Sequence, residues 1–428
     1  MNQTLKPKIG FQVIQGKPQY VQVTIPNDWK LEPFEKHYEL IKGKIPKTLF
    51  ETNGIGKLPY LTSGYLKGDD EEYAEKSDGV LVNESDVIMI GDGDGSGRVY
   101  TANNGILAST FVLLKKKDSS KIDTRFVFYY LQHKYPFFRY TRYGTGIPHL
   151  DQHILNNLWI PVLEKKEEEK IISIFSNIDR IQNLIDTKIE KLKLMKKAII
   201  EKLLSVGLEN KKPQSVDWYY GKQIEIPEGW EYTTLSAVIH PMRYGTSKKS
   251  NDIHEGIPVI GISNIKFNKI IYDDADYVDL TSREINAFSL DYGDILIIRT
   301  NANLKNLGQC AMFDNVGTWG FASFLMKIKP NLDRIDPRFL LILLNSNFIR
   351  NQIPIIAQTT VGKYNINKEN LGSLKIILPS LPEQIKIIDI SSNIDSEIQP
   401  HEDYKLKLES IKQYFMNNLL NGNVRVKI

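Results

Sequence analysis

The stretch "GDGDGSGRVYTANN", residues 91–104, contains residue types that serve several kinds of binding loop. Its acidic side chains match the first positions of a calcium-binding loop, but position 12, which must be a bidentate Glu, is Asn103. A phosphate-binding loop needs Gly-Lys-Ser/Thr at the start of a helix, whereas Arg98 and two β-type residues follow here. Neither chemistry fits, so the stretch has to be interpreted from the elements around it.

The motifs of common nucleotide- and DNA-modifying enzymes are absent from the sequence. There is no Asn-Pro-Pro-Tyr/Phe motif, no Gly-rich nucleotide loop with its Lys, no convincing set of nuclease carboxylates and no zinc deaminase signature. His149 and His153 have the i,i+4 spacing of zinc ligands, but no third ligand lies nearby. We therefore predict a non-catalytic protein without a bound metal.

Size and composition indicate a globular protein of two or three domains. The chain has 428 residues, of which 41% are hydrophobic and 25% charged, with a formal net charge of +4. The N-terminus lacks the apolar core of a signal peptide and no apolar run is long enough to span a membrane, so we expect a cytoplasmic protein. The single cysteine agrees with a reducing compartment. The modest positive charge permits a polyanionic partner without indicating one.

The chain contains two copies of one unit. Residues 146–205 align with residues 362–421 without a gap, at an offset of 216, and 18 of the 60 positions are identical. Upstream the match is weaker but keeps its order: "IPNDW" pairs with "IPEGW", "LPYL" with "IPVI", "DVIMI" with "DILII" and "IDTRF" with "IDPRF". The spacing between these pairs changes gradually, which indicates loops of different length between the same elements.

Each copy begins as a compact α/β domain and ends in a long helix. Short β-type runs, Gly and Asn turns and one or two short helices fill the first part. Apolar residues recur every seven positions from about residue 164 to residue 205, which predicts a coiled-coil helix that packs antiparallel against its own copy about a pseudo-twofold axis. Pro400 and His401 interrupt the second copy, so we expect that helix to be kinked or broken. The residues predicted to pack the helices together are Ile171, Ile178, Ile185, Leu192, Ile199, Ile387, Ile394, Leu408 and Phe415.

In this organisation the sequence resembles the specificity subunits of type I restriction-modification enzymes over nearly its whole length. The resemblance rests on the twin "IPxxW" openings, the run "LPSLPEQIKII" at residues 378–388, its degenerate partner "IPVLEKKEEEKII" at residues 160–172 and the ending "LLNGNVRVKI". The first helix departs from the family pattern, because Lys166 and Glu168 stand at the places of Pro382 and Gln384. This departure affects the partner contacts expected at that end.

The resemblance implies a mixed α/β fold in which two target-recognition domains are separated by two long antiparallel coiled-coil helices. The implied function is sequence-specific recognition of double-stranded DNA, each domain reading one half of a bipartite, asymmetric target. Two methyltransferase subunits and restriction/translocase subunits would be the partners, and they would use S-adenosylmethionine, ATP and Mg, whereas this chain would hold no cofactor. The implied domains are residues 1–158 (first recognition domain), 159–211 (first long helix and spacer), 212–375 (second recognition domain) and 376–428 (second long helix).

A coiled-coil scaffold that does not bind DNA is the alternative function, and the modest net charge favours it. The two predictions differ in what the loops do, because a DNA reader needs Lys and Arg for phosphates and polar side chains for base edges, presented by loops on a stiff frame.

The second copy has "RTNANLKNLGQ", residues 299–309, opposite the stretch with which we began. The acidic side chains are not shared, as expected if each copy reads a different half-sequence. We therefore interpret these loops, and the polar segments before each long helix, as facing DNA, with an ordinary solvated turn as the alternative for any one residue. The predicted contacts are Arg98, Tyr100, Asn103, Asn104, Arg142, Tyr143 and Thr145 in the first copy, and Arg243, Lys248, Lys249, Arg299, Asn301, Asn303, Lys305, Thr359, Thr360 and Lys363 in the second.

Overall fold

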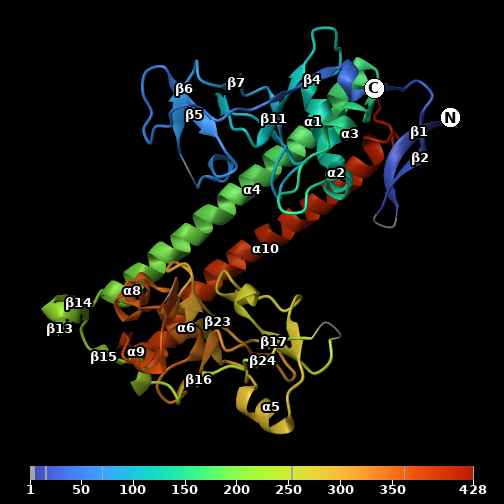
Figure 1. Cartoon of the computed structure of the whole chain (residues 1–428). Coiled ribbons are helices and arrows are strands. Elements are labelled where there is room, and N and C mark those ends of the chain that lie inside the picture. Colours follow the sequence, from blue (N-terminus) through green and yellow to red (C-terminus); the bar gives the residue numbers. More distant parts are fainter. Residues whose placement is uncertain (1–4, 15–16, 70, 252–253, 361, 428) are drawn as a thin grey trace. The chain divides into compact units, whose positions relative to one another are not determined.

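The chain forms two compact units in the computed structural model (Figure 1). Unit 1 contains Met1–Asp186 and Asp403–Ile428, and unit 2 contains Thr187–Glu402. The C-terminal part of the chain thus folds with the N-terminal domain, and each unit receives part of both long helices. The structure describes residues 5–14, 17–69, 71–251, 254–360 and 362–427. The linear division into four domains made from the sequence stays a prediction.

The described part of unit 1 is built on two four-stranded sheets (Figure 1). In the first, all neighbours are antiparallel and the order is β4 (Tyr38–Lys42), β11 (Phe111–Lys116), β8 (Val87–Ile90) and β9 (Val99–Thr101). The second has the order β6 (Tyr73–Glu75), β5 (Lys57–Leu61), β10 (Gly105–Leu107) and β7 (Val80–Val82), with β5 and β10 parallel. The other strands and α-helices are β1 (Leu5–Ile14), β2 (Lys17–Pro26), β3 (Lys30–Pro33), β12 (Trp159–Val162), α1 (Thr124–His133), α2 (Tyr135–Tyr140), α3 (Gln152–Asn156), the first part of α4 (Lys165–Val206) and the last part of α10 (Leu381–Leu419).

Unit 2 repeats this topology. Its four-stranded antiparallel sheet has the order β16 (Arg243–Tyr244), β25 (Leu325–Ile328), β21 (Ile295–Ile298) and β23 (Cys310–Met312). A second sheet has β20 (Asp276–Val278), β17 (Ile257–Ile260) and β24 (Gly320–Phe321), again with one parallel pair, β17 and β24. The pair β15 (Glu231–Thr234) and β28 (Lys375–Leu378) corresponds to β3 and β12. The predicted duplication is therefore confirmed in strand order and direction.

Smaller elements complete unit 2. The remaining strands are β13 (Pro213–Asp217), β14 (Gln223–Pro227), β18 (Ile265–Lys266), β19 (Lys269–Ile270), β22 (Thr300–Asn301), β26 (Gln358–Thr360) and β27 (Lys363–Asn365). The α-helices are the last part of α4, α5 (Ser282–Phe288), α6 (Pro337–Asn345), α7 (Asn347–Arg350), α8 (Ile353–Ile356), α9 (Lys368–Gly372) and the first part of α10 (Leu381–Leu419).

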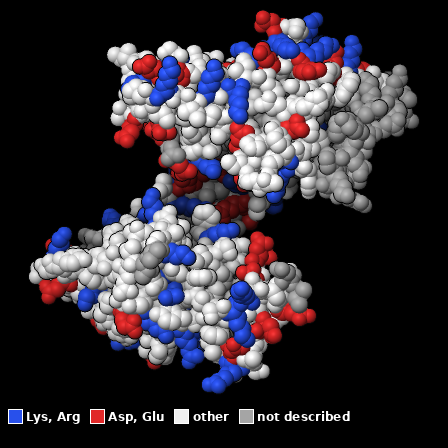
Figure 2. Space-filling model, in the orientation of Figure 1, with Lys and Arg blue, Asp and Glu red and all other residues white. Residues whose placement is uncertain are grey.

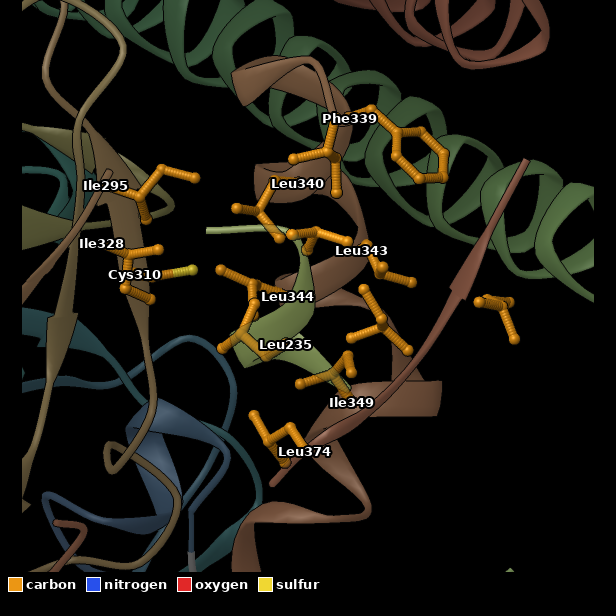
Figure 3. Close-up of a cluster of buried hydrophobic side chains, with 14 of the residues drawn as sticks. Leu235, Ile295, Cys310, Ile328, Phe339, Leu340, Leu343, Leu344, Ile349 and Leu374 are labelled. Carbon is orange, nitrogen blue, oxygen red and sulfur yellow. The ribbon is translucent and has the colours of Figure 1, made fainter. Parts of the chain in front are cut away.

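The core of unit 2 lies between α6 and its antiparallel sheet. Figure 3 shows Leu340 and Leu344 of α6 beside Cys310 and Ile328 of the sheet, and all four side chains are fully buried. Burial raises the pKa of the Cys310 thiol to about 12. The single cysteine is therefore a packed core residue and remains a neutral thiol at physiological pH.

The long helices run antiparallel to each other in unit 1. Lys412 of α10 lies 2.5 Å from Asp179 of α4, and Lys405 lies 2.6 Å from Asp186. Since the residue numbers fall along one helix as they rise along the other, the two segments point in opposite directions.

The helix segments of unit 2 are antiparallel as well. Lys196 lies 2.6 Å from Asp395, and Lys193 lies 2.6 Å from Glu402. The first of these pairs is the copy, at an offset of 216 in both residues, of an ion pair of unit 1. The residues predicted to pack the helices are all buried or half-buried, namely Ile171, Ile178, Ile185, Leu192, Ile199, Ile387, Ile394, Leu408 and Phe415.

The break expected at Pro400 is wrong, because α10 continues through this residue. Pro400 lacks an N–H and therefore leaves the carbonyl of Ser396, four residues earlier, without its helical partner. Both residues are on the exposed side of the helix, where water can bond to that carbonyl. Packing of the neighbouring Ile398, which is buried, supports the helix at this point.

One buried side chain anchors the first turn of each long helix to the domain of its unit. In unit 1, the backbone N–H of Asp123 donates to Glu168 Oε1 at 2.7 Å. In unit 2, the backbone N–H of Asp336 donates to Gln384 Oε1 at 2.9 Å. Asp123 and Asp336 are also the N-caps of α1 and α6, accepting backbone N–H groups with their carboxylates. Each aspartate thus ties a domain helix to a long helix.

The anchors differ in charge, and a second position differs with them. Glu168 is compensated by Lys165, whose Nζ lies 3.0 Å from Glu168 Oε2. In the second copy Leu381 stands at the place of Lys165, and the anchor is the neutral Gln384. The amide of Gln384 donates to two backbone carbonyls, both at 3.0 Å. Where the first copy departs from the family pattern, Glu168 therefore forms an ion pair with Lys165 in place of the amide hydrogen bonds that Gln384 makes in the second copy.

A second contact closes each unit at the end of the other long helix. In unit 1, Arg425 binds the buried Glu167 through two nitrogens and also pairs with Asp28 at 2.8 Å. Trp29 Nε1 donates to the same Glu167 at 3.0 Å. These hydrogen bonds with Glu167 and Asp28 raise the pKa of Arg425. The segment after α10 is thereby fixed to the start of the first domain.

In unit 2 the copy of this glutamate is Glu383, which pairs with Lys211 at 2.9 Å, just after α4. Trp230 is the copy of the tryptophan, and its Nε1 has no hydrogen-bond partner in the described part of the chain. Glu383 is therefore paired with Lys211, whereas Glu167 is bound by Arg425 and by the indole N–H of Trp29.

Over the residues that the structure describes, no single helix is long and apolar enough to cross a membrane. The bent pair Pro337–Asn345 and Asn347–Ile356 reaches the necessary length and apolar composition only when its two helices are taken together.

We expect Gln384→Glu to lower the free energy of unfolding by about 3 kcal/mol, because it buries a carboxylate without a cation and turns it toward two carbonyl oxygens. Adding Leu381→Lys should restore much of this loss by recreating the first copy's ion pair. Urea denaturation measures both effects.

The matched control is Glu168→Gln, which keeps the acceptor for Asp123 and should cost less than about 1 kcal/mol. A Gln384→Glu chain as stable as the wild type would contradict the account of the anchor.

Candidate nucleic-acid interface

The Gly-rich stretch of unit 1 is a tight connection between β8 and β9. The backbone N–H of Ile90 donates to Arg98 O at 2.9 Å, and that of Gly97 donates to Ile90 O at 2.8 Å. Gly97 has a φ of +88°, and a Cβ there would lie 2.6 Å from Phe138 of α2. The glycine is therefore required by the turn and by its approach to a helix.

Asp92 uses its carboxylate to hold a second segment. Its Oδ1 lies 2.7 Å from His149 Nδ1 and its Oδ2 lies 3.0 Å from Lys42 Nζ. Burial would raise the pKa of Asp92, but the hydrogen bonds from His149 and Lys42 lower it below 3.8 overall. Among the described residues there is no group of three or more His, Cys, Asp or Glu side chains suited to a metal ion. The acidic residue thus fastens two loops together.

The second segment is a short hairpin formed by residues 143–149. Tyr143 and His149 exchange backbone hydrogen bonds of 3.2 and 2.8 Å. The backbone N–H of Leu150 donates to Gly91 O, and that of Gly93 donates to Pro148 O, both at 2.8 Å. The β8–β9 loop and this hairpin, which the sequence predicted as two separate DNA-facing segments, therefore lie side by side.

Arg142 is mostly enclosed, with 11% of its side chain exposed. Its Nε donates to Ser96 O at 3.1 Å and its Nη2 donates to Tyr135 Oη at 2.9 Å. Arg142 therefore links the β8–β9 loop to Tyr135 of α2. Tyr143 and Thr145 are exposed at the hairpin, and Arg98 is exposed beside it.

Unit 2 contains the same arrangement. The loop after β21 includes β22, which pairs with β27 of the β26–β27 hairpin, and Thr300 lies opposite Asn365. These residues are the copies of Asp92 and His149, which form an isolated bridge in unit 1. The hydrogen bond from Leu150 to Gly91 also recurs, from Ile366 to Arg299 at 2.8 Å.

The predicted residues of this second loop have different roles. Asn301 Oδ1 accepts the backbone N–H of Asn303 at 2.8 Å, and Asn303 Oδ1 accepts that of Lys305 at 2.9 Å, so both amides shape the turn. Arg299 donates to Ser323 O at 3.1 Å, and its guanidinium carbon lies 4.4 Å from the ring centroid of Tyr244.

The hairpin of unit 2 carries the other predicted polar residues. Thr359 and Lys363 are exposed, on β26 and β27 respectively. The backbone of Thr360 pairs with Lys363, and its side chain lies outside the described part of the structure.

Other predicted residues are not brought to these loops. Asn103 and Asn104 are exposed but follow β9, at the opposite end of that strand from Arg98. Tyr100 is half-buried, packing edge-on against Phe111 with centroids 6.4 Å apart.

Three predicted cations lie near the β16 end of the sheet in unit 2. Lys248 forms an ion pair with Glu284 at 2.8 Å, so its charge is compensated within the unit. Lys249 is exposed, and Arg243 is exposed on β16 beside Tyr244.

Sequence reasoning missed Tyr135 and Tyr244, whose rings contact the predicted Arg98 and Arg299. It also missed Lys42, which pairs with Asp92, and Lys368, which lies on the Tyr244 ring. The register of β4 and β16 places Lys42 and Tyr244 at equivalent positions, next to the loop after β8 or β21. Figure 2 shows Lys and Arg interspersed with Asp and Glu on the visible face, and the described residues of that face form no continuous basic surface.

Comparison with known proteins agrees with this architecture. The model of the type I restriction modification DNA specificity domain matches residues 26–194 and 227–410. The MjaVIII specificity subunit of a type I restriction enzyme from Methanocaldococcus jannaschii is 30% identical over 419 residues, 94% of each chain. A putative MjaX specificity subunit from the same organism is 27% identical over 430 residues, covering 94% of this chain and 95% of that one. The crystal structure of a type I restriction-modification S subunit from M. genitalium has a TM-score of 0.52 at 16% identity, covering 92% of this chain and 96% of the other, which shows the shared fold.

The duplicated domains and the comparisons define a non-catalytic subunit that recognises specific DNA sequences. The chain belongs to the family of type I restriction-modification specificity subunits. Such a subunit binds DNA and assembles with the other subunits of its complex.

We expect Asp92→Asn to loosen the contact between the β8–β9 loop and the hairpin, because it removes the charge that holds Lys42 and His149. Amide hydrogen exchange at Gly93 and Leu150 should accelerate roughly fivefold, corresponding to about 1 kcal/mol. In the wild type the same loosening should begin only below about pH 4, because the lowered pKa of Asp92 keeps its carboxylate charged above that pH.

The control is Asp94→Asn, because Asp94 is fully exposed and its nearest cation is 4.0 Å away. Equal exchange rates in Asp92→Asn and the wild type would contradict this role.

Proposed function

We propose that each unit reads one half of a bipartite, asymmetric DNA target and that the chain delivers two methyltransferase subunits and restriction/translocase subunits to it. The ion pair between Lys196 and Asp395 in unit 2 repeats the one between Lys412 and Asp179 in unit 1, which supports two equivalent readers. Equivalent readers would address the duplex in the same way, one on each strand.

The observation that carries this proposal is the repeated loop frame with different side chains. The backbone bonds from Leu150 to Gly91 and from Ile366 to Arg299 are equivalent, whereas the side chains at these loops differ between the copies. A constant frame with variable side chains is what two readers of unlike half-sequences require. A plain scaffold, favoured by the net charge of +4, gives no reason for this combination.

The chemistry of the complex belongs, in this proposal, to the partners. Methyl transfer would use S-adenosylmethionine and translocation would use ATP and Mg, all bound by partner subunits. This chain would contribute the position of the complex on DNA.

Mobility-shift assays with and without the methyltransferase partner test the proposal. We expect weak binding by the chain alone and sequence-specific binding by the complex, with methylation mapping supplying the target. Absence of DNA binding in both cases would favour the scaffold.

A fragment of residues 1–212 should form a homodimer that, with the methyltransferase, modifies a palindrome of the first half-target. It retains the helix segment that closes unit 2, so Lys211 of one copy can pair with Glu167 of the other in place of Arg425. Glu167→Gln should weaken this dimer roughly tenfold, by about 1.4 kcal/mol. Sedimentation equilibrium measures the association.

In the full chain Lys211 pairs with Glu383, which the fragment lacks. Glu383→Gln in the full chain therefore shows the effect of losing the contact of Lys211 with a glutamate inside one chain, for comparison with the dimer. A fragment that stays monomeric at high concentration, or that still modifies the intact bipartite target, would count against the duplication as a functional one.

A further inference from the structure

In unit 2 two cations share one tyrosine ring. The guanidinium carbon of Arg299 lies 4.4 Å, and Nζ of Lys368 lies 4.6 Å, from the ring centroid of Tyr244. Both distances are within the range of attraction between a cation and an aromatic face. The backbone N–H of Lys368 donates to Tyr244 Oη at 3.3 Å, and Arg299 also donates to Ser323 O. Tyr244 therefore contacts both the loop after β21, through Arg299, and the start of α9, through Lys368.

Unit 1 has a related arrangement built from another element, in which Arg142 also donates a hydrogen bond to the Tyr135 hydroxyl at 2.9 Å. The guanidinium carbons of Arg98 and Arg142 lie 5.0 and 5.7 Å from the ring centroid of Tyr135. Tyr135 begins α2, whereas Tyr244 ends β16. In both units one cation comes from the loop after β8 or β21 and the other from a segment that flanks the hairpin. The arrangement therefore recurs without being inherited from aligned positions.

These cations carry positive charge that the protein does not neutralise. Within the described residues, no carboxylate lies within ion-pair distance of Arg98, Arg299 or Lys368, and Arg142 has only the exposed Asp94 at 4.0 Å. Arg299 Nε is buried and has no hydrogen-bond partner in that part of the chain. Two like charges on one ring repel each other, and an electronegative ligand that meets both would remove this repulsion.

We propose that Tyr135 and Tyr244 are positioning residues that hold cations at the DNA: Arg299 and Lys368 in unit 2, and the exposed Arg98, supported by the enclosed Arg142, in unit 1. This inference rests on the proposed reading of DNA and names the groups that perform it. The matching chemistry is an electronegative acceptor of the duplex, which phosphate oxygens and the O6 and N7 atoms of guanine both supply.

The test uses the full chain in complex with its methyltransferase and duplexes that carry the mapped target or substitutions in either half. Tyr244→Leu should weaken binding roughly tenfold, because an aromatic support for a desolvated cation is lost. Tyr244→Phe keeps the ring and should restore most of the affinity. Tyr135→Leu should produce the corresponding loss for the first half.

Two patterns of loss support the proposal and separate the sources of the acceptor. If Tyr244→Leu reduces discrimination in the second half only, the cations meet base edges. If affinity falls for every duplex and the slope of log K against log salt falls by about one, they meet phosphate. Arg334→Gln is the matched control, since this exposed arginine of unit 2 is paired with Glu231 at 2.7 Å and should leave binding unchanged.

A folded Tyr244→Leu complex with unchanged affinity, discrimination and salt slope overturns the proposal. If that variant does not fold, Arg299→Gln and Lys368→Gln remove the cations and leave the ring, and full affinity in both overturns it equally. A wild-type complex that ignores the second half-sequence would instead contradict the proposed function, so the two failures are distinguishable.

Discussion

The hydrogen bond between the first turn of each long helix and the backbone at the start of α1 or α6 is the interaction on which each unit depends. Glu168 and Gln384 are buried, so water cannot replace the oxygen that they offer to Asp123 and Asp336. Because each aspartate also caps its domain helix, one residue fixes the domain core against the long helix. The loops that we propose to read DNA are then positioned by a sheet that packs on that same domain helix.

The two anchors also show how a duplicated unit diverges without losing its geometry. In the first copy the aspartate N–H donates to a carboxylate that is paired with a lysine, and in the second it donates to an amide oxygen. At the loops the same principle applies, since backbone bonds hold the frame and the side chains differ. In the proposed function, specificity could therefore change in one half of the target while the path of the chain stays constant.

Much of the fold could be predicted from the sequence, because it is carried by local patterns and by their repetition. The self-alignment identified strands and helix starts that the structure places at equivalent positions, such as the "DVIMI" and "DILII" strands. The break at Pro400 was wrong because the exposed side of a helix tolerates an unpaired carbonyl better than the sequence pattern suggests.

The candidate site was predictable in part. Polar loops in both copies marked the place, and the structure joins the loop to the hairpin in each unit. The supporting rings could not be predicted, since Tyr135 is 37 positions from Arg98 and Tyr244 is 55 from Arg299, in elements that do not align. Asn103 and Asn104 were grouped with Arg98 because they are near in sequence, and a strand separates them.

The central claim is that the two units are equivalent readers, and exchanging residues 26–162 with residues 227–378 tests it most directly. Because both anchors offer an acceptor to the equivalent backbone N–H, that of Asp123 or that of Asp336, the exchanged domains retain their attachment. If the readers are equivalent, one on each strand, the exchanged chain presents the same two readers turned end for end, so methylation mapping should return the same bipartite target. A target whose two half-sequences had changed places would show that the units read DNA in tandem and would contradict the account.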